Sequence, residues 1–314
     1  MEKSLYIKNL QVPKGKIDVV MDTDAYNEID DQFALAYLLK STEKLNTVAI
    51  YAAPFFNHRS KSPADGMQKS YDEILKLLKL MGKEELEGIT FKGSENYLKD
   101  ENTPVISPAV TDLINRAKNY SPENPLYVVA IGAITNIASA LIAAPEIAEN
   151  IVIVWLGGHC HNHKDTAEFN MVQDIAAARV VFKSQAPLVQ LPCVGVVSSF
   201  YFSLAELEQY LKGKNELCDF LFENMVQYKN EVEIKADFDN KVYSKVIWDV
   251  TAVGWLLHDN DWMMPSRLVP TYLPTYDHHY AQNPDGHLMR YVYSINRDEL
   301  MKDLFDKIIN FKKD

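Results

Sequence analysis

The chain has 314 residues, of which 47% are hydrophobic and 24% are charged. This balance is typical of a soluble globular protein with enough apolar material for a large core. The formal net charge of −11 argues against nucleic acid as a partner, because a phosphate backbone would be repelled. The sequence shows neither a secretory leader nor the ~18 apolar residues of a membrane-spanning helix. We therefore expect a cytoplasmic protein with no membrane contact.

Apolar runs of strand length alternate with segments of helical periodicity through the first two-thirds of the chain. The expected strands cover residues 17–21, 47–52, 127–130, 151–156 and 188–191. The expected helices between them cover residues 32–40, 67–81, 109–117, 136–143 and 175–183. This alternation predicts an α/β fold with a mainly parallel, Rossmann-like open central sheet and helices on both faces.

The last third of the chain has a different pattern. Amphipathic segments cover residues 204–211, 216–230, 244–257 and 297–311, with a turn-rich stretch at 270–285. They predict a helical C-terminal cap. Because no linker or repeat marks a boundary, we expect residues 1–314 to form a single domain. Ligands of open parallel sheets bind beyond the carboxyl ends of the strands, so candidate site residues should directly follow strands.

The cysteines do not indicate a site of their own. Cys160, Cys193 and Cys218 are widely spaced and odd in number, which fits neither a disulfide framework nor a CxxC metal site. We expect them to be reduced. Cys160 could act as a nucleophile, but a small buried residue is the favoured interpretation.

Four acidic residues surround the end of the first expected strand. Asp22 and Asp24 follow it, and Asp30 and Asp31 precede the next helix. Carboxylates that converge in a crevice repel one another and need a cation, a shared proton or a cationic ligand. Oxygen-only ligands favour Ca²⁺ or Mg²⁺ over zinc. In the plainer interpretation Asp30 caps the helix and the other acids are solvated.

A strand that ends in Asp-x-Asp is also similar to phosphatases of the haloacid dehalogenase type, in which the first Asp is the nucleophile. Their motif has Thr or Val two residues after the second Asp, and here that position is Tyr26. The stretch from Asp22 to Asp31 more closely resembles the DTDxxxDD signature of nucleoside hydrolases. The match departs from that family in its spacer, since residues 25–29 replace the usual three.

Three further segments resemble the same family in the same chain order. Residues 132–136 (GAITN) are similar to its GPLTN segment, residues 167–170 match AEFN, and Asp249 occupies the position of the late metal-binding Asp. The resemblance covers about residues 17–255. It implies a calcium-dependent enzyme that hydrolyses the N-glycosidic bond of a ribonucleoside, and a homodimer or homotetramer is expected from the family's habit.

The resemblance also implies roles for single residues. Ca²⁺ would be held by Asp24, Asp31, Asp249 and the backbone carbonyl of Thr135, a set that leaves room for water and sugar hydroxyls. The ribose hydroxyls would be bound by Asp30, Asn162, Glu168 and Asn170. Without the family, Glu168 and Asn170 could simply end a loop; Asp174 is the better candidate to cap the helix at 175–183.

Cleavage of the bond builds positive charge on the ribose and releases a poor leaving group. Asp24 is the candidate general base for a calcium-activated water. Trp248 precedes Asp249 where many members carry His, and resembles the purine-preferring branch, in which stacking aids departure of the base. The alternative is that Trp248 packs in the core of an apolar helix.

Other assignments stay open. His159, His161 and His163 alternate as zinc ligands can on a strand, but no fourth ligand is apparent. One of them, His58 or Tyr243 could be the proton donor to the base. Asn57, Phe55 and Phe56 are candidate sugar or base contacts. The rival functions are a non-catalytic homologue that binds a riboside or sugar and, less favoured, the Asp-nucleophile phosphatase.

Overall fold

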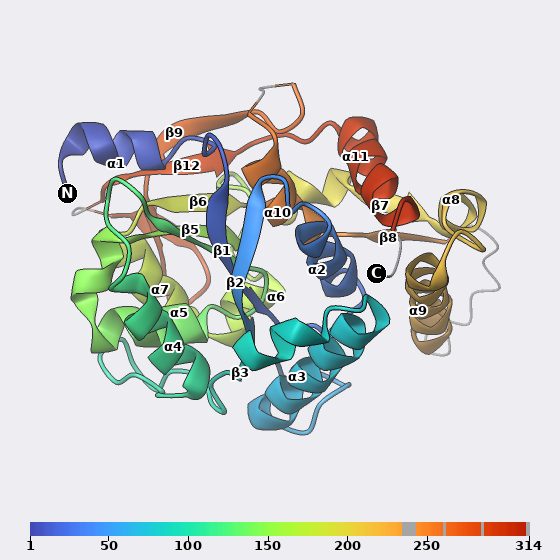
Figure 1. The fold of residues 1–314 in the computed structure, drawn as a ribbon. Coiled ribbons are helices and arrows are strands. Elements are labelled where there is room, and N and C mark those ends of the chain that lie inside the picture. The colour runs from blue at the N-terminus through green and yellow to red at the C-terminus, as the bar shows by residue number, and fades with distance from the viewer. Residues whose placement is uncertain (234–242, 260–261, 284–285, 312–314) are drawn as a thin grey trace.

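The computed structural model describes residues 1–233, 243–259, 262–283 and 286–311 (Figure 1). Its central feature is an eight-stranded sheet with the order β3-β2-β1-β4-β5-β6-β12-β9. The strands are β1 Ile17–Thr23, β2 Leu45–Ala52, β3 Thr90–Lys92, β4 Leu126–Ala130, β5 Ile151–Leu156, β6 Leu188–Leu191, β9 Ser266–Pro270 and β12 Leu288–Val292. All neighbours pair in parallel except β9, which is antiparallel to β12. The expected mainly parallel sheet is confirmed.

Helices connect the strands and cover the sheet. The α-helices are α1 Lys3–Asn9, α2 Asp31–Leu39, α3 Pro63–Leu80, α4 Pro108–Ala117, α5 Thr135–Ala143, α6 Phe169–Gln173, α7 Ile175–Lys183, α8 Leu204–Tyr210, α9 Glu216–Glu233, α10 Val250–Leu257 and α11 Arg297–Ile309. Short 3-10 helices are η1 Glu84–Ile89, η2 Pro145–Glu149 and η3 Val197–Ser199. None of the described helices is both long and apolar enough to cross a membrane.

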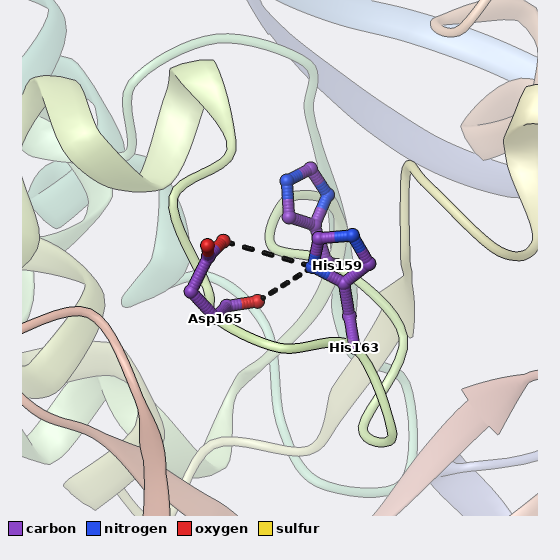
Figure 2. A group of neighbouring side chains, drawn as sticks. All are labelled: His159, His163 and Asp165. Atoms are coloured by element: carbon purple, nitrogen blue, oxygen red, sulfur yellow. Dashed lines mark hydrogen bonds and ion pairs between the residues drawn. The ribbon is translucent and has the colours of Figure 1, made fainter.

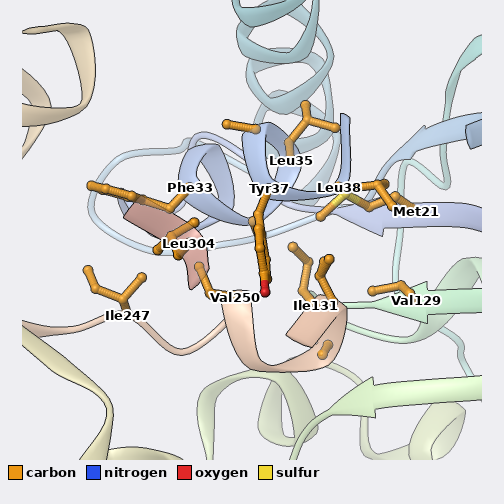
Figure 3. Packing of buried hydrophobic residues seen from close by; sticks show 14 of the residues in the cluster. Met21, Phe33, Leu35, Tyr37, Leu38, Val129, Ile131, Ile247, Val250 and Leu304 are labelled. Carbon is orange, nitrogen blue, oxygen red and sulfur yellow. The ribbon is translucent and has the colours of Figure 1, made fainter. Parts of the chain in front are cut away.

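The sheet is buried on both faces, which explains the nearly continuous apolar runs of its strands. Successive residues of β1 face opposite sides, so Val19 and Met21 join one core and Val20 joins the other. The first core contains residues of α2, α3, α10 and α11, and the second contains residues of α4, α5 and α7. Figure 3 shows Phe33 and Tyr37 of α2 close to Val250 of α10 in the first core.

The strand order reverses direction at β1. The chain moves from β1 outward to β2 and β3, and then returns to the other side of β1 for β4, β5 and β6. At such a switch point the connections after neighbouring strands leave in opposite directions, which opens a crevice at the carboxyl ends of the strands. The carboxyl end of β1 is where the acidic residues lie.

The C-terminal part is less purely helical than expected. The segment at 244–257 is not one helix: it forms β8 Ser244–Val246 and then α10, and β8 pairs with β7 Tyr201–Ser203. The turn-rich stretch contains the hairpin of β10 Tyr272–Pro274 and β11 Tyr280–Gln282, although its residues 284–285 lie outside the described part. β12 was not expected, because its short run is interrupted by a buried charge, Arg290.

Candidate active site

A cavity of about 420 Å³ opens at the carboxyl ends of β1, β4 and β5. Its walls contain six of the residues that the sequence singled out: Asp24, Asp30, Glu168, Asn170, Trp248 and Asp249. These residues come from distant parts of the chain, from Asp24 after β1 to Asp249 before α10. A larger groove of about 610 Å³ near Glu101 is a poorer candidate, because the Glu101 carboxylate is already paired with Arg179 and Lys183.

Buried carboxyl groups form the centre of the cavity. Asp30, Asp31 and Asp249 each offer an oxygen within 4.8 Å of the others. Asp24 lies beside them, and its Oδ2 has no hydrogen-bond partner among the described residues. Asp31 begins α2 and Asp249 directly precedes α10. Helix N-termini favour nearby negative charge, which helps to explain why the chain tolerates these groups in its interior.

The neighbours of the cluster orient single oxygens. The hydroxyl of Thr23 donates to Asp31 Oδ1 at 2.5 Å, and the backbone N–H of Trp248 donates to Asp30 Oδ2 at 2.9 Å. These bonds hold the end of β1 and the residue before Asp249 against the same group of carboxyls. The spacing of the carboxyls is therefore set by the packing of α2 against α10.

Burial and mutual repulsion change the ionisation of the cluster. Burial, followed by the charges of Asp31 and Asp30, raises the pKa of Asp24 well above its usual range. Burial and the Asp30 charge raise the pKa of Asp31 to about 7, and the pKa of Asp249 also lies far above normal. Without a cation the cluster must hold protons at neutral pH. An all-oxygen set with an unpartnered buried oxygen fits a hard divalent metal ion.

Asp22 faces a different environment from Asp24. Its Oδ1 accepts a hydrogen bond from the Asn136 side-chain amide at 2.7 Å, and it does not line the cavity. Burial raises its pKa to about 7. Since a nucleophile must reach the substrate, this position argues against Asp22 as the nucleophile of a phosphatase and leaves Asp24 as that interpretation's other candidate.

The structure does not bring two of the expected residues to the cavity. Thr135 opens α5, so its carbonyl points along the helix, and its hydroxyl donates to Asp174 at 2.8 Å. The backbone that lines the cavity is four residues earlier, at Ile131. Asn162 is exposed in the loop after β5 and does not line the cavity. Thr135 thus lies in a helix and Asn162 in an exposed loop, and neither lines the cavity.

Glu168 and Asn170 are fixed by backbone groups. The Glu168 carboxylate caps α6 and accepts the N–H groups of Gly158, Asn170 and Met171 at 2.9 to 3.0 Å. The Asn170 amide donates to the carbonyls of Ile131 and Leu156, both at 3.1 Å. Both residues also line the cavity. Their hydrogen bonds to the backbone therefore fix the positions of two polar side chains in its wall. Asp174 caps α7 through Ala177 N–H, as predicted.

The enlarged spacer at 25–29 forms part of the cavity wall. Its apolar residues are buried, while Asn27 and Glu28 line the cavity. Glu28 accepts hydrogen bonds from Tyr228 Oη at 2.8 Å and from Lys245 Nζ at 2.5 Å. The Lys245 charge opposes the rise that burial causes in the pKa of Asp30. No sequence signal links Glu28 to Lys245, because they are far apart in the chain and on different elements.

The remaining candidates divide between cavity and core. Asn57, His58 and His159 line the cavity, whereas Phe55 is buried in the interior. Trp248 is half-buried: it packs against the first core and also lines the cavity. Cys193, which the sequence did not single out for the site, lies beside Glu168. Burial and the Glu168 charge raise the pKa of its thiol well above the usual range.

Comparison with known proteins agrees with this geometry. A family model described as inosine-uridine preferring nucleoside hydrolase matches residues 19–282. The chain is 30% identical over 198 residues to the non-specific ribonucleoside hydrolase RihC of Salmonella paratyphi B. That match covers 56% of this chain and only 60% of the relative.

Solved structures show the same fold at low sequence identity. A plant nucleoside hydrolase, PpNRh1, aligns with a TM-score of 0.71 and 17% identity over 95% of this chain and 100% of its own. A purine-preferring ribonucleoside hydrolase from Gardnerella vaginalis aligns with a TM-score of 0.70 and 20% identity over 94% and 98%.

Proposed function

The chain belongs to the inosine-uridine preferring nucleoside hydrolase family, and on this basis we propose that it hydrolyses ribonucleosides to ribose and free base. The observation that carries the proposal is the group of buried carboxyls around Asp24, at the end of β1 and open to a cavity. The sugar ring gains positive charge as the N-glycosidic bond breaks. Carboxylates fixed in a site that excludes most water stabilise that charge strongly.

The proposal includes Ca²⁺ as the cofactor. Asp24, Asp31 and Asp249 would hold it, with Asp30 a further candidate because its carboxyl belongs to the same group. The Ile131 carbonyl takes the place that was expected of Thr135, since its residue lines the cavity. When bound, the ion would acidify a water molecule and anchor vicinal hydroxyls of the sugar. Ribosides should therefore react faster than deoxyribosides.

Individual residues of the cavity are proposed to have separate roles in the reaction. Asp24 would take a proton from water, since its carboxyl lies in the cavity and its Oδ2 has no hydrogen-bond partner among the described residues. Asn170 and Glu168, held by backbone bonds, would orient the sugar. Trp248 would stack on the base, which supports a preference for purines, whose larger ring offers more area to stack on. Tyr228 lies in the same wall and could contact the base as well.

The proposal also includes a cytoplasmic location and a homo-oligomer. Cys160, Cys193 and Cys218 are free thiols, which fits a reducing cytoplasm. A homodimer or homotetramer stays a prediction, which sedimentation equilibrium would test. A non-catalytic role in binding a riboside stays the alternative, because a binding site and an active site can share these walls.

The test is the release of reducing sugar from purine, pyrimidine and deoxy nucleosides, with and without EGTA. We expect ribose from wild type in Ca²⁺ and a loss of at least about 10³-fold in Asp24→Asn, at the upper part of the range for a general base. Asp22→Asn is the matched control: it is isosteric, lies two residues before Asp24 at the end of β1 and keeps an oxygen for Asn136, so it should lose less than about tenfold.

Three results would redirect the proposal. If no nucleoside is cleaved but calcium and ribose analogues bind, the binding role replaces the hydrolase. If Asp22→Asn abolishes activity and Asp24→Asn does not, the roles of the two carboxyls are reversed. If EGTA has no effect on turnover, calcium is not the cofactor.

A further inference from the structure

The loop between β5 and α6 holds a second group of metal-ligand side chains, separate from the buried carboxyls. His159, His163 and Asp165 each offer one ligand atom, and these atoms lie within 4.8 Å of one another. Figure 2 shows the three side chains gathered on one side of the loop. They are half-buried, so an ion could reach them from solvent. His159 also lines the cavity, which puts this group at its wall.

The geometry separates these residues from the third histidine of the loop. His161 turns away: its Nε2 lies 3.0 Å from Gln190 Oε1, and its ring packs 4.2 Å, centre to centre, from that of Tyr291. His159 and His163 instead bring their rings to 4.4 Å. Asp165 Oδ1 lies 3.6 Å from His163 Nδ1. The zinc interpretation of three alternating histidines is therefore wrong in its ligand set, because Asp165 takes the place of His161.

Two neighbouring imidazoles, tilted 58° to each other, and a carboxylate are suited to a transition-metal ion. Burial and the neighbouring His163 lower the pKa of His159, so its ring is neutral and has a lone pair for a metal. A backbone hydrogen bond from Ala167 lowers the pKa of Asp165, which keeps this carboxylate ionised. The competing cation, Lys164, is 83% exposed at 3.6 Å from Asp165, and such surface pairs are weak.

We propose that His159, His163 and Asp165 bind a divalent transition-metal ion of the zinc class at the wall of the cavity. Two nitrogens and one oxygen are typical ligands of Zn²⁺, and three protein ligands leave one position for water or another group. Tetrahedral zinc with bonds of about 2.0 to 2.1 Å places its ligands roughly 3.3 Å apart. The ligand atoms, now within 4.8 Å, reach that spacing by rotation of side chains in one short loop.

The ligand atoms also determine which metal ion each of the two sites should prefer. Calcium prefers oxygen ligands and should choose the carboxyls around Asp24, whereas imidazole favours zinc, cobalt, nickel or copper. Because all three ligands lie within a single seven-residue stretch, few backbone degrees of freedom must be fixed when the ion binds. This second site is independent of whether the cavity cleaves nucleosides.

The test is calorimetric titration of the full chain with Zn²⁺, with Ca²⁺ in excess so that the carboxyl site is filled. We expect one zinc per chain, and affinity at least about tenfold weaker in His163→Gln and in Asp165→Asn, since each loses a ligand. The matched control is His279→Gln, which removes a histidine whose side chain is 60% exposed and lies outside the group. It should bind zinc as wild type does.

Circular dichroism of each variant shows whether it is folded, and the comparison uses folded variants only. The proposal is overturned if wild type takes up no zinc at about 100 micromolar, which corresponds to an affinity too weak for a built site. It is equally overturned if His163→Gln and Asp165→Asn bind zinc as tightly as His279→Gln. Neither readout depends on nucleoside turnover, so failure of the hydrolase proposal would leave this one standing.

Discussion

The stability of the calcium-free protein should fall as the pH rises from 5 to 7. The pKa of Asp31 in the folded chain is about 7, whereas an Asp carboxyl in an unfolded chain has a pKa of about 3.9. Between these values the folded state keeps a proton that the unfolded state has released. Unfolding then releases a proton, so the free energy of unfolding falls by about 1.4 kcal/mol per pH unit.

The expected size follows from this one carboxyl. Two pH units correspond to about 3 kcal/mol for Asp31 alone. A chain of 314 residues has an unfolding entropy of roughly 0.66 kcal/mol/K, so the melting temperature should drop by about 4 °C. The raised pKa values of Asp24 and Asp249 act in the same direction. The calcium ion proposed for the site would bind the ionised carboxyls, so its stabilising effect should grow over the same pH range.

The assay is differential scanning calorimetry at pH 5, 6 and 7, in EGTA and in excess Ca²⁺. Asp31→Asn cannot ionise, so its pH slope in EGTA should be shallower than that of wild type by about 1.4 kcal/mol per unit. Asp65→Asn is the control, because Asp65 lies at the surface and its pKa is lowered by Lys69. A melting temperature in EGTA that is constant or rises from pH 5 to 7 would refute the reasoning.

Three further substitutions test separate parts of the site. Trp248→Ala should raise KM for purine nucleosides more than for pyrimidine nucleosides, by about tenfold if stacking contributes roughly 1.5 kcal/mol; equal effects would contradict stacking. Lys245→Met removes the cationic partner of the half-buried Glu28, which keeps the Tyr228 hydroxyl, and should cost about 1.5 to 3 kcal/mol in chemical denaturation. Glu28→Gln in the same chain should largely restore the loss. Asn162→Ala should change KM less than about twofold in steady-state assays, because the side chain is exposed.

Prediction from sequence succeeded where local pattern and burial carry the same information. The runs that become β4 and β5 carry no charged residue and are buried along their whole length. β1 and β6 carry only a few polar residues among their buried apolar ones. β12 was missed because it carries Arg290, whose guanidinium donates to the Leu10 carbonyl at 2.7 Å. That contact joins residues 280 apart, and periodicity within a short window cannot reveal it.

In the site, too, residues positioned by local structure could be predicted, whereas those positioned by contacts across the chain could not. Asp24, Asp30 and Asp31 could be placed together because one strand and one helix end position them. Asp249 and Trp248 were found only through the family resemblance. Glu28 escaped notice because its partner, Lys245, approaches from a distant part of the chain. Thr135 was misplaced because a matched motif does not show whether a carbonyl belongs to a loop or to a helix.

The distance along the chain between Asp31 and Asp249 has a consequence for synthesis. A ribosome delivers the chain from the N-terminus, so β1 and α2 exist long before the residue that completes the cluster emerges. Until α10 docks against α2, the early acids lack both Asp249 and the N–H that Trp248 donates to Asp30. A nascent chain therefore holds only part of the cluster, and a metal ion bound there would stabilise the fold fully only after α10 has docked.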